Sequence, residues 1–490
     1  MLVSRTSRTT TDHVRDHIKI VLLLCFNMVM MDMNRIFIFF LLIQTTAGCN
    51  YHSSTGAYVQ SQTVTLIAVL FWRPISSYLT DYYPKQNHLL LLITSILECL
   101  GLLAMLLLVA FNNSTISPWS VLLLACVKQC IEVQLLNSTY KIFKMRLQLI
   151  CGLNNCESQC HVISAVGIFS EFAELIFNIL TCVTAYLFIS HGASFEAVKY
   201  IYFGTTLIAS MCCVTLSISI YNQASNYYIG DDTNVTLSAL QSVTVTATAP
   251  LLDVASASSL LPSSLTLKDR VKGVCRVTVA VGSIILITLL YMAQELLYSV
   301  ESLAIPGRNV NQSITPVPNN FCSGYVTNTI YQDIWENCFY MLGTLIYILV
   351  LKRMNPFTFF RYLFPATMIV LMGLSVVVTN LSGMSQLILA LALQSTVAFE
   401  YFLLLFVKYL SIASVASEYY GVLSFITGSL QSLVDLSIYG CMSYGVATSF
   451  LNGVMYVFMI LTVLFALMFS VGYKKELLIT NQHCDGTRNT

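Results

Sequence analysis

Residues 88–111 read HLLLLITSILECLGLLAMLLLVAF, and Glu98 is the one acidic or basic side chain among them apart from a histidine at the start. A helix needs about 20 mostly apolar residues to cross the hydrocarbon core of a bilayer. A helix that is apolar on every side is stable only where lipid or other helices surround it. The stretch therefore predicts a membrane-spanning helix, and the same criterion can be applied to the rest of the chain.

Twelve stretches meet this criterion, six on each side of a polar segment rich in Ser, Thr, Ala and Asn. The predicted spans are residues 18–43, 58–79, 88–111, 119–143, 161–190, 197–222, 273–303, 328–351, 357–380, 383–411, 418–447 and 450–473. We predict an all-α polytopic membrane protein with twelve transmembrane helices in two six-helix bundles, the layout of a two-bundle transporter. The predicted parts are a tail (1–17), a first bundle (18–222), a linker (223–272), a second bundle (273–473) and a tail (474–490).

The composition supports this class. The 490 residues are 56% hydrophobic and 10% charged, with a mean hydropathy of +0.74. A soluble protein of this size must cover its surface with polar side chains, so this composition excludes a soluble protein. The net charge of +1 gives no reason to expect nucleic acid as a partner. The lipid bilayer is the expected surrounding.

The first apolar run, residues 18–43, follows a basic segment. It is longer than the core of a cleaved signal peptide, which has about 7–15 residues. It also carries Asp32 and Arg35 in its middle. We therefore expect it to remain in the mature chain as the first span.

Basic residues fall mainly on one alternating set of predicted loops. Of the 24 Lys and Arg residues, 16 lie in the two tails, the linker, and residues 80–87, 141–146 and 352–361, and Lys19 and Arg276 at the adjoining helix edges raise the number to 18. The positive-inside rule then places both termini in the cytoplasm. On the opposite side, glycosylation sequons begin at Asn112, Asn113, Asn311 and Asn380. We expect a glycoprotein, with the plasma membrane as its default location.

The 16 cysteines are scattered through apolar runs, where a free cysteine behaves as a small hydrophobic residue. Cys151, Cys156 and Cys160 match no usual zinc spacing, so we expect no metal site. Cys49 and Cys322 fall in loops predicted on the same side and could pair, although the sequence does not decide the connectivity.

Charged residues inside a span are costly and require a partner or a cavity. Asp32 and Arg35 lie three residues apart, so they can meet on one helix face. Lys128 and Glu132, four residues apart, can do the same. The acids singled out within the spans are Asp32, Glu98, Glu132, Glu171, Glu174, Glu295, Glu336, Glu400 and Asp435, and the bases are Arg35, Arg73, Lys128 and Lys408.

Tyr291, Glu295 and Tyr298 lie at i, i+4 and i+7 on one face of the seventh predicted span. A carboxylate between two phenols suits a cationic or aromatic ligand through ion pairing and cation–π contact. A Tyr-rich packing face is the alternative. Trp335 beside Glu336 repeats the pattern, although a Trp near a membrane boundary is usually an interfacial anchor.

Short stretches through most of the chain resemble, in order, the motifs of one transporter family. They are Leu79-Thr80-Asp81-Tyr82, Ile131-Glu132-Val133 with Tyr140-Lys141-Ile142, Tyr331-Gln332-Asp333-Ile334-Trp335-Glu336, Ile412-Ala413-Ser414, and the segment from Glu418 to Phe425. Together they look like the reduced folate carrier and thiamine transporter family, which belongs to the major facilitator superfamily.

The resemblance implies that Asp81 belongs to a cytoplasmic gate. It also implies that Glu132 and Glu336 are cavity carboxylates that contact a vitamin. Two departures bear on the ligand. Arg35 stands where the first helix of the family carries an acid, and Glu400 is the charge near the place where the tenth helix of the family often has an Arg.

We expect no enzyme and no cofactor, because the chain has no Walker loop, no H-E-x-x-H motif and no believable G-x-S-x-G motif. Without an ATP site, concentrative transport must use an ion gradient or a counter-solute, and protons or an organic counter-ion are the candidates. Glu171 and Glu174 could titrate, because burial raises the pKa of a carboxyl group.

We predict transport of a small vitamin-like solute by alternating access. Folates are dianions and need several basic residues, whereas the excess of acids in the spans favours thiamine, a cation. The predicted contacts are Glu132, Glu336, Tyr291, Glu295, Tyr298, Glu400 and Trp335. The alternatives are folate or another organic ion or nucleoside, a channel, and a receptor or sensor that no longer transports.

Overall fold

The protein is described by a computed structural model. It describes residues 17–45, 51–82, 86–111, 118–151, 156–192, 195–229, 267–304, 323–351, 358–380, 386–415, 417–443 and 448–486.

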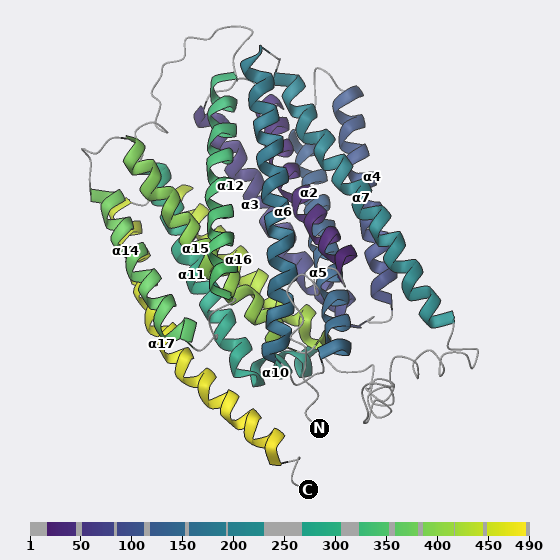
Figure 1. Ribbon diagram of the computed structural model, residues 1–490. Helices are drawn as coiled ribbons and strands as arrows, with labels where there is room; N and C mark the ends of the chain where they lie inside the picture. The colour runs from purple at the N-terminus through teal and green to yellow at the C-terminus, as the bar shows by residue number, and fades with distance from the viewer. Residues whose placement is uncertain are drawn as a thin grey trace.

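Twelve long helices make up most of this described part, in two sets of six (Figure 1). The first set is α2 (Ile18–Thr45), α3 (Tyr51–Tyr82), α4 (Asn87–Phe111), α5 (Pro118–Cys151), α6 (Cys156–Ser190) and α7 (Phe195–Ile229). The second set is α11 (Thr278–Ala304), α12 (Ser323–Leu351), α14 (Phe364–Asn380), α15 (Gln386–Ser414), α16 (Tyr420–Ser443) and α17 (Thr448–Gly486). These twelve helices confirm the predicted fold class.

Three shorter elements lie between the long helices. They are α10 (Leu267–Arg276), a π-helical turn η3 (Phe359–Leu363) and a 3-10 turn η4 (Ser417–Tyr419). Helix α10 and turn η4 contact each other, and both lie at the end of the bundle where the two chain termini are marked in Figure 1. We call this end the linker end.

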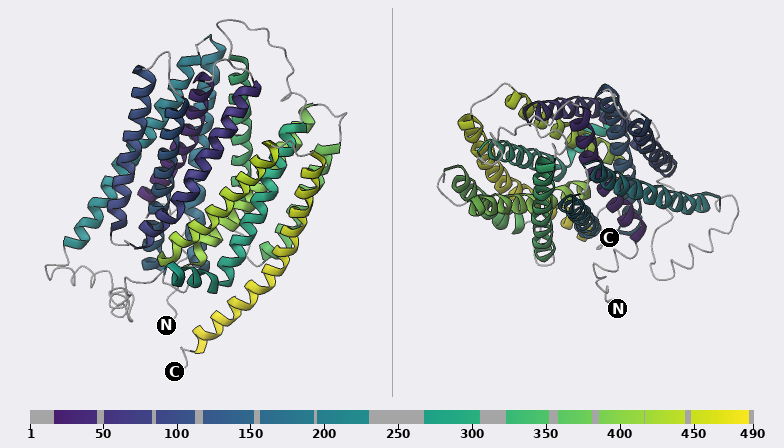
Figure 2. Two further views of the ribbon diagram at one scale, coloured as in Figure 1. Left: turned by 180° about the vertical axis from the view of Figure 1, so that it is seen from behind. Right: turned by 90° about the horizontal axis from the view of Figure 1, so that it is seen from above.

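The two sets of helices stand side by side (Figure 2). Within the first set, α2 packs against α7 and α3 against α5; within the second, α11 packs against α17 and α12 against α15. Between the sets, α6 packs against α12 and α15, and α16 packs against α3. The site described below lies between these two interfaces.

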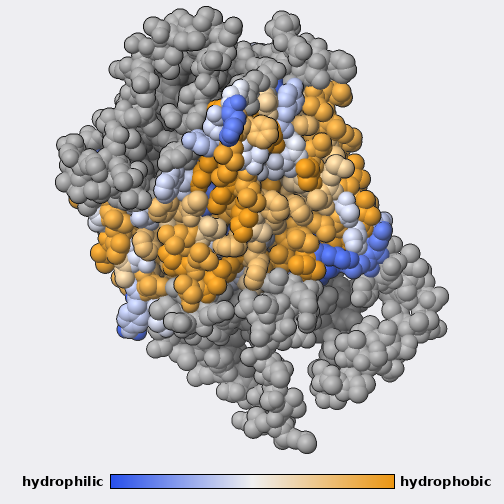
Figure 3. All heavy atoms as spheres, turned by 45° about the horizontal axis from the view of Figure 1, so that its top comes forward, coloured by the Kyte–Doolittle hydropathy of each residue, from blue (hydrophilic) through white to orange (hydrophobic). Residues whose placement is uncertain are grey.

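The outer surface is apolar, as a lipid environment requires. Nine of the described helices are long and apolar enough, by length and composition, to cross a membrane. Large exposed side chains such as Leu123, Ile208 and Leu464 point outward from them. In the face shown in Figure 3, hydrophobic side chains cover much of the described middle of the molecule. The chain is a multi-pass membrane protein.

Several helix ends differ from the predicted boundaries. The predicted linker was to begin at residue 223, but α7 continues to Ile229, and residues 267–276 of the predicted linker and second bundle form the separate helix α10. Helix α5 continues to Cys151 and α17 to Gly486, beyond the predicted ends at 143 and 473. Hydropathy measures the length of a helix that lipid covers, and polar turns continue outside that length, where water satisfies their side chains.

Candidate functional site

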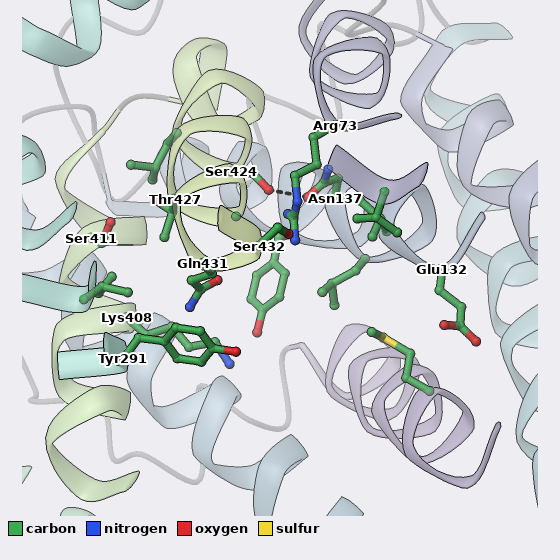
Figure 4. A pocket seen from close by; sticks show the side chains of 18 of the residues that line it. Arg73, Glu132, Asn137, Tyr291, Lys408, Ser411, Ser424, Thr427, Gln431 and Ser432 are labelled. Carbon is green, nitrogen blue, oxygen red and sulfur yellow. Dashed lines mark hydrogen bonds between the residues drawn. The ribbon is translucent and has the colours of Figure 1, made fainter. Parts of the chain in front are cut away.

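A cavity of about 400 Å³ lies between the two sets of helices (Figure 4). This volume falls within the range of about 300–1,000 Å³ that is typical of small-molecule sites. Helices α2, α3 and α5 line it from the first set, and α11, α15 and α16 from the second. Its polar lining residues are Arg35, Arg73, Gln129, Glu132, Asn137, Tyr140, Tyr291, Lys408, Ser411, Tyr420, Ser424, Thr427, Gln431, Ser432 and Asp435.

Helix α16 supplies a mostly polar stripe to this lining. The stripe is Tyr420, Leu423, Ser424, Thr427, Gly428, Gln431, Ser432 and Asp435, in which Leu423 and Gly428 are the members without a polar side chain. Its steps of three and one keep one helix face toward the cavity. Sequence reasoning picked out Asp435 as an intramembrane acid but missed the stripe, because its other members are neutral. The three-and-one spacing of small polar residues was the signal that could have found it.

Of the residues that the structure describes, three bases and two acids line the cavity. The bases are Arg35, Arg73 and Lys408, and the acids are Glu132 and Asp435. Most of the acids singled out in the spans therefore lie off the lining. The excess of acids that favoured a cationic substrate is a property of the spans as a whole and does not extend to the cavity wall.

Glu132 belongs to a buried cluster at the edge of the cavity. Lys128 donates to Glu132 at 2.9 Å, which confirms that this pair meets on one face of α5. Lys128 also pairs with Glu98 of α4, and Asn34 of α2 donates to Glu132 at 3.0 Å. Removal of one partner from such a buried group leaves the others unsatisfied, which is strongly destabilising. The cluster fixes the position of Glu132 on the cavity wall.

A second cluster joins the two sets of helices at Glu171 of α6. Lys408 of α15 donates to its carboxylate at 2.7 Å and Tyr409 at 2.9 Å, and Tyr401 also donates to it. The structure thus gives Lys408 a partner 237 residues away in the sequence. Asp32 and Arg35 approach to 4.0 Å, as their spacing predicts.

The remaining predicted contacts are divided. Tyr291 lines the cavity and interacts with Asp435. Glu295 interacts electrostatically with Asp435 and Glu336. Glu336 accepts a hydrogen bond from Tyr340 at 2.9 Å, and Trp335 is half-exposed beside Phe339. These three residues, Glu295, Glu336 and Trp335, are off the described lining.

Some predictions lie outside the described residues. They are the sequons at Asn112, Asn113 and Asn311, the Cys49–Cys322 pair, and the side chains of Tyr298, Glu400 and Asn380. Of the described residues, no group of three or more His, Cys, Asp or Glu side chains could hold a metal ion. The described cysteines are free thiols.

The linker end of the cavity is closed by contacts between the sets. Asp81, at the end of α3, accepts hydrogen bonds from the backbone N–H groups of Gly421 (3.0 Å) and Val422 (3.1 Å) in the first turn of α16. These N–H groups have no partner inside their own helix, and the helix dipole favours a negative charge there. Lys141 of α5 pairs with the same carboxylate at 2.6 Å. Asp81 therefore caps a helix of the opposite set.

Lys144 forms the complementary contact. It donates to the carbonyl oxygens of Ile412 (2.7 Å) and Ala413 (2.9 Å), in the last turn of α15, where a positive charge is favoured. Arg270 of α10 donates to the carbonyl oxygens of Asp81 (3.0 Å) and Glu418 (3.1 Å). Lys141 also donates to the carbonyl oxygen of Ser417, so three charged residues of the first set, together with α10, hold the α15–α16 connection.

Comparison of the whole fold with solved structures identifies its class. The chain is similar to the proton:xylose symporter XylE, a major facilitator superfamily protein, with a TM-score of 0.61, 11% identity, and coverage of 95% of this chain and 96% of that one. A bacterial homologue of the iron transporter ferroportin in an outward-facing state has a TM-score of 0.58 and 12% identity, with coverage of 94% and 99%.

The E. coli fucose:proton symporter FucP has a TM-score of 0.55 and 11% identity, with coverage of 94% of this chain and 98% of that one. No protein-family model and no curated protein matches the sequence. Identities this low show the fold alone, and that fold is the twelve-helix major facilitator fold.

Proposed function

Because the chain has the major facilitator fold, we propose that it is a secondary transporter that moves a small organic solute across a membrane by alternating access. The supporting observation is a cavity between two sets of helices that is closed at one end by contacts between those sets. In alternating access, two bundles rock about a central site, so each opening exposes the site to one side only. The cavity is the substrate site in this proposal.

Asp81 is the centre of the gate in this proposal. Opening toward the linker end requires the loss of its bonds to Gly421, Val422 and Lys141, and of the Lys144 contact with α15. The basic residues at this end, which include Lys141, Lys144 and Arg270, favour a cytoplasmic location for it. The gate is then the cytoplasmic gate, both termini are cytoplasmic, and the plasma membrane is the proposed location.

The substrate in this proposal is a vitamin-like organic ion. Thiamine fits the tyrosines and Glu132, but three basic side chains on the lining are unfavourable for a simple cation. A solute that carries an anionic group, as folate does, fits Arg35, Arg73 and Lys408 better. We therefore reverse the order of preference and place an organic anion or zwitterion before thiamine.

Protons or an organic counter-ion drive the cycle in this proposal. Asn178 donates to both Asp32 (3.1 Å) and Glu174 (3.2 Å), which brings two carboxyl groups of α2 and α6 together. Glu174 is thus a candidate proton carrier close to Glu171, and uptake is expected to depend on pH.

The test is uptake of radiolabelled folate and thiamine by cells that express the full chain, each at two pH values. Accumulation of either solute above that of mock cells supports transport, and competition by a panel of other organic ions and nucleosides extends the search. A chain that binds a solute without accumulating it is a receptor or sensor, and that outcome overturns the proposal.

A further inference from the structure

Arg73 is a charged residue of the cavity wall that sequence analysis left without a role. It lies in α3 directly before Pro74, which has no N–H to donate to the carbonyl of Leu70 and so interrupts the helical bonding there. In Figure 4 the guanidinium points toward Ser432 of α16 and lies beside Asn137 of α5. Both of these residues line the cavity.

The guanidinium rests directly on Gly428 of α16. A Cβ atom at position 428 would overlap Nη1 and Cζ of Arg73, so only glycine leaves room for the side chain in this position. Pro74 in α3 and Gly428 in α16 thus combine to allow a charged side chain of one set to lie against the backbone of the other.

The charge of Arg73 is not fully compensated. Its Nε atom is buried and has no hydrogen-bond partner among the described residues, and the same holds for the hydroxyl of Thr427 next to Gly428. Its electrostatic partners are Tyr291 and Asp435, across the cavity. A buried donor on a charged group that lacks a partner is costly, and a ligand that supplies an acceptor removes that cost.

The shape of the group selects the ligand. A guanidinium presents its N–H groups in a planar fork that matches the two oxygens of a carboxylate or phosphate. Ser432 and the Asn137–Ser424 pair, joined at 2.6 Å, place further small polar groups beside it (Figure 4). Asp435 opposite can accept a positive or hydroxyl group of the same ligand.

We propose that Arg73, held on Gly428, is the binding site for an oxyanion group, carboxylate or phosphate, of the solute that enters this cavity. This inference rests on the proposed function only in calling the ligand a transported solute. Binding of an oxyanion at Arg73 does not depend on transport.

The experiment measures binding to the purified full-length protein in detergent by thermal shift and by equilibrium binding. The probes are matched pairs that differ in an oxyanion group: nicotinate against nicotinamide, thiamine monophosphate against thiamine, and folate against folate dimethyl ester. The first pair tests a carboxylate, the second a phosphate and the third the carboxylates of a larger vitamin. We expect the oxyanion member of at least one pair to bind at least about tenfold more tightly than its partner.

In Arg73→Gln, we expect this preference to fall about tenfold or more, and Arg73→Lys to restore part of it. Gly428→Ala, which displaces the guanidinium, should lower the preference without a change in charge. Arg361→Gln removes the same charge from an exposed position of turn η3, outside the lining, and should leave binding unchanged. A neutral partner that binds as well as its oxyanion form in every pair, or a preference that survives Arg73→Gln, overturns the inference.

Two further outcomes separate this inference from the proposed function. Oxyanion-dependent binding without uptake overturns transport and keeps the site, whereas uptake that is unaffected by Arg73→Gln keeps transport and overturns the site. If Arg73 served only to pair with Asp435, Asp435→Asn would lower the oxyanion preference as much as Arg73→Gln does, and that result also overturns the inference.

Discussion

In two contacts between α3 and α16, a charged side chain of α3 lies against a glycine of α16, but the two charges differ in how fully they are hydrogen-bonded. At the linker end Asp81 lies against Gly421, and at the cavity Arg73 lies against Gly428. The two charged residues are eight apart on α3 and the two glycines seven apart on α16, so both contacts fall on one seam between antiparallel helices. Asp81 has its full set of donors, whereas Arg73 has a buried N–H without a partner.

The difference indicates that the two contacts between α3 and α16 have different roles. A fully satisfied buried charge fixes two helices in register, and its loss is costly. An unsatisfied one is ready to bind a ligand from the cavity. In the proposed transport cycle, the Asp81–Gly421 contact would hold the closed state, and the Arg73–Gly428 contact would respond to a substrate.

The largest effect is expected from Asp81→Asn. The change removes the charge that pairs with Lys141 and caps α16, and loss of one member of a buried pair costs about 3–5 kcal/mol. We expect uptake to fall to the background of mock cells and the melting temperature of the purified protein to drop. The control is Asp269→Asn, which neutralises an exposed acid on α10. Uptake above half of the wild-type rate would show that this contact does not hold the gate.

Glu132→Gln comes next and extends the comparison to a satisfied charge on the cavity wall. The amide weakens the bonds to Lys128 and Asn34 and removes the charge that faces the solute. We expect uptake to be abolished while the amount at the cell surface, measured by biotinylation, persists. Normal uptake in this variant would remove Glu132 from the site.

The two glycines provide the sharpest test of the difference. A Cβ at position 421 would lie 2.7 Å from Cγ of Asp81, whose carboxylate is held by hydrogen bonds, and 2.8 Å from the backbone carbonyl oxygen of Ser77. We expect Gly421→Ala to lower stability by about 1–3 kcal/mol, as overpacking does. Gly428→Ala should cost less, because the Arg73 side chain can swing aside into the cavity. Equal losses of melting temperature in the two variants would contradict the distinction.

The smallest effect on stability is expected from Arg73→Gln. Because this change removes a buried charge that is incompletely satisfied, the melting temperature should stay the same or rise, within about 1 kcal/mol in stability. The same measurement on Asp81→Asn supplies the contrast. A fall as large as that of Asp81→Asn would mean that Arg73 serves mainly to hold the two sets together.

The sequence predicted the helices better than the contacts. An apolar run such as residues 88–111 indicates directly that its helix is surrounded by lipid or by other helices. The spacing of Lys128 and Glu132 predicts their ion pair because both lie on one helix. The partner of Lys408 could not be found in this way, since Glu171 lies 237 residues away on another helix. The sequence also could not show which of the acids face the cavity, because the position of a residue along its helix does not show which neighbouring helix its side chain faces.

The candidate site shows the same limit. Glu132 lines the cavity, whereas two other glutamates are off the described lining: Glu295 bonds to Tyr291, and Glu336 accepts a hydrogen bond from Tyr340. The spacing of the polar stripe of α16 can be seen in the sequence. Its small neutral side chains, however, change the hydropathy much less than a charged side chain does, so the stripe is easily missed.

The sequence by itself determined that this chain is a set of membrane helices, because the cost of exposing backbone and polar groups to lipid acts on each helix alone. Only the tertiary structure decided which charges meet across the two sets, which line a shared cavity and which are sealed at the linker end. Those outcomes depend on the rotation and register of each helix against its neighbours, which packing between distant segments sets.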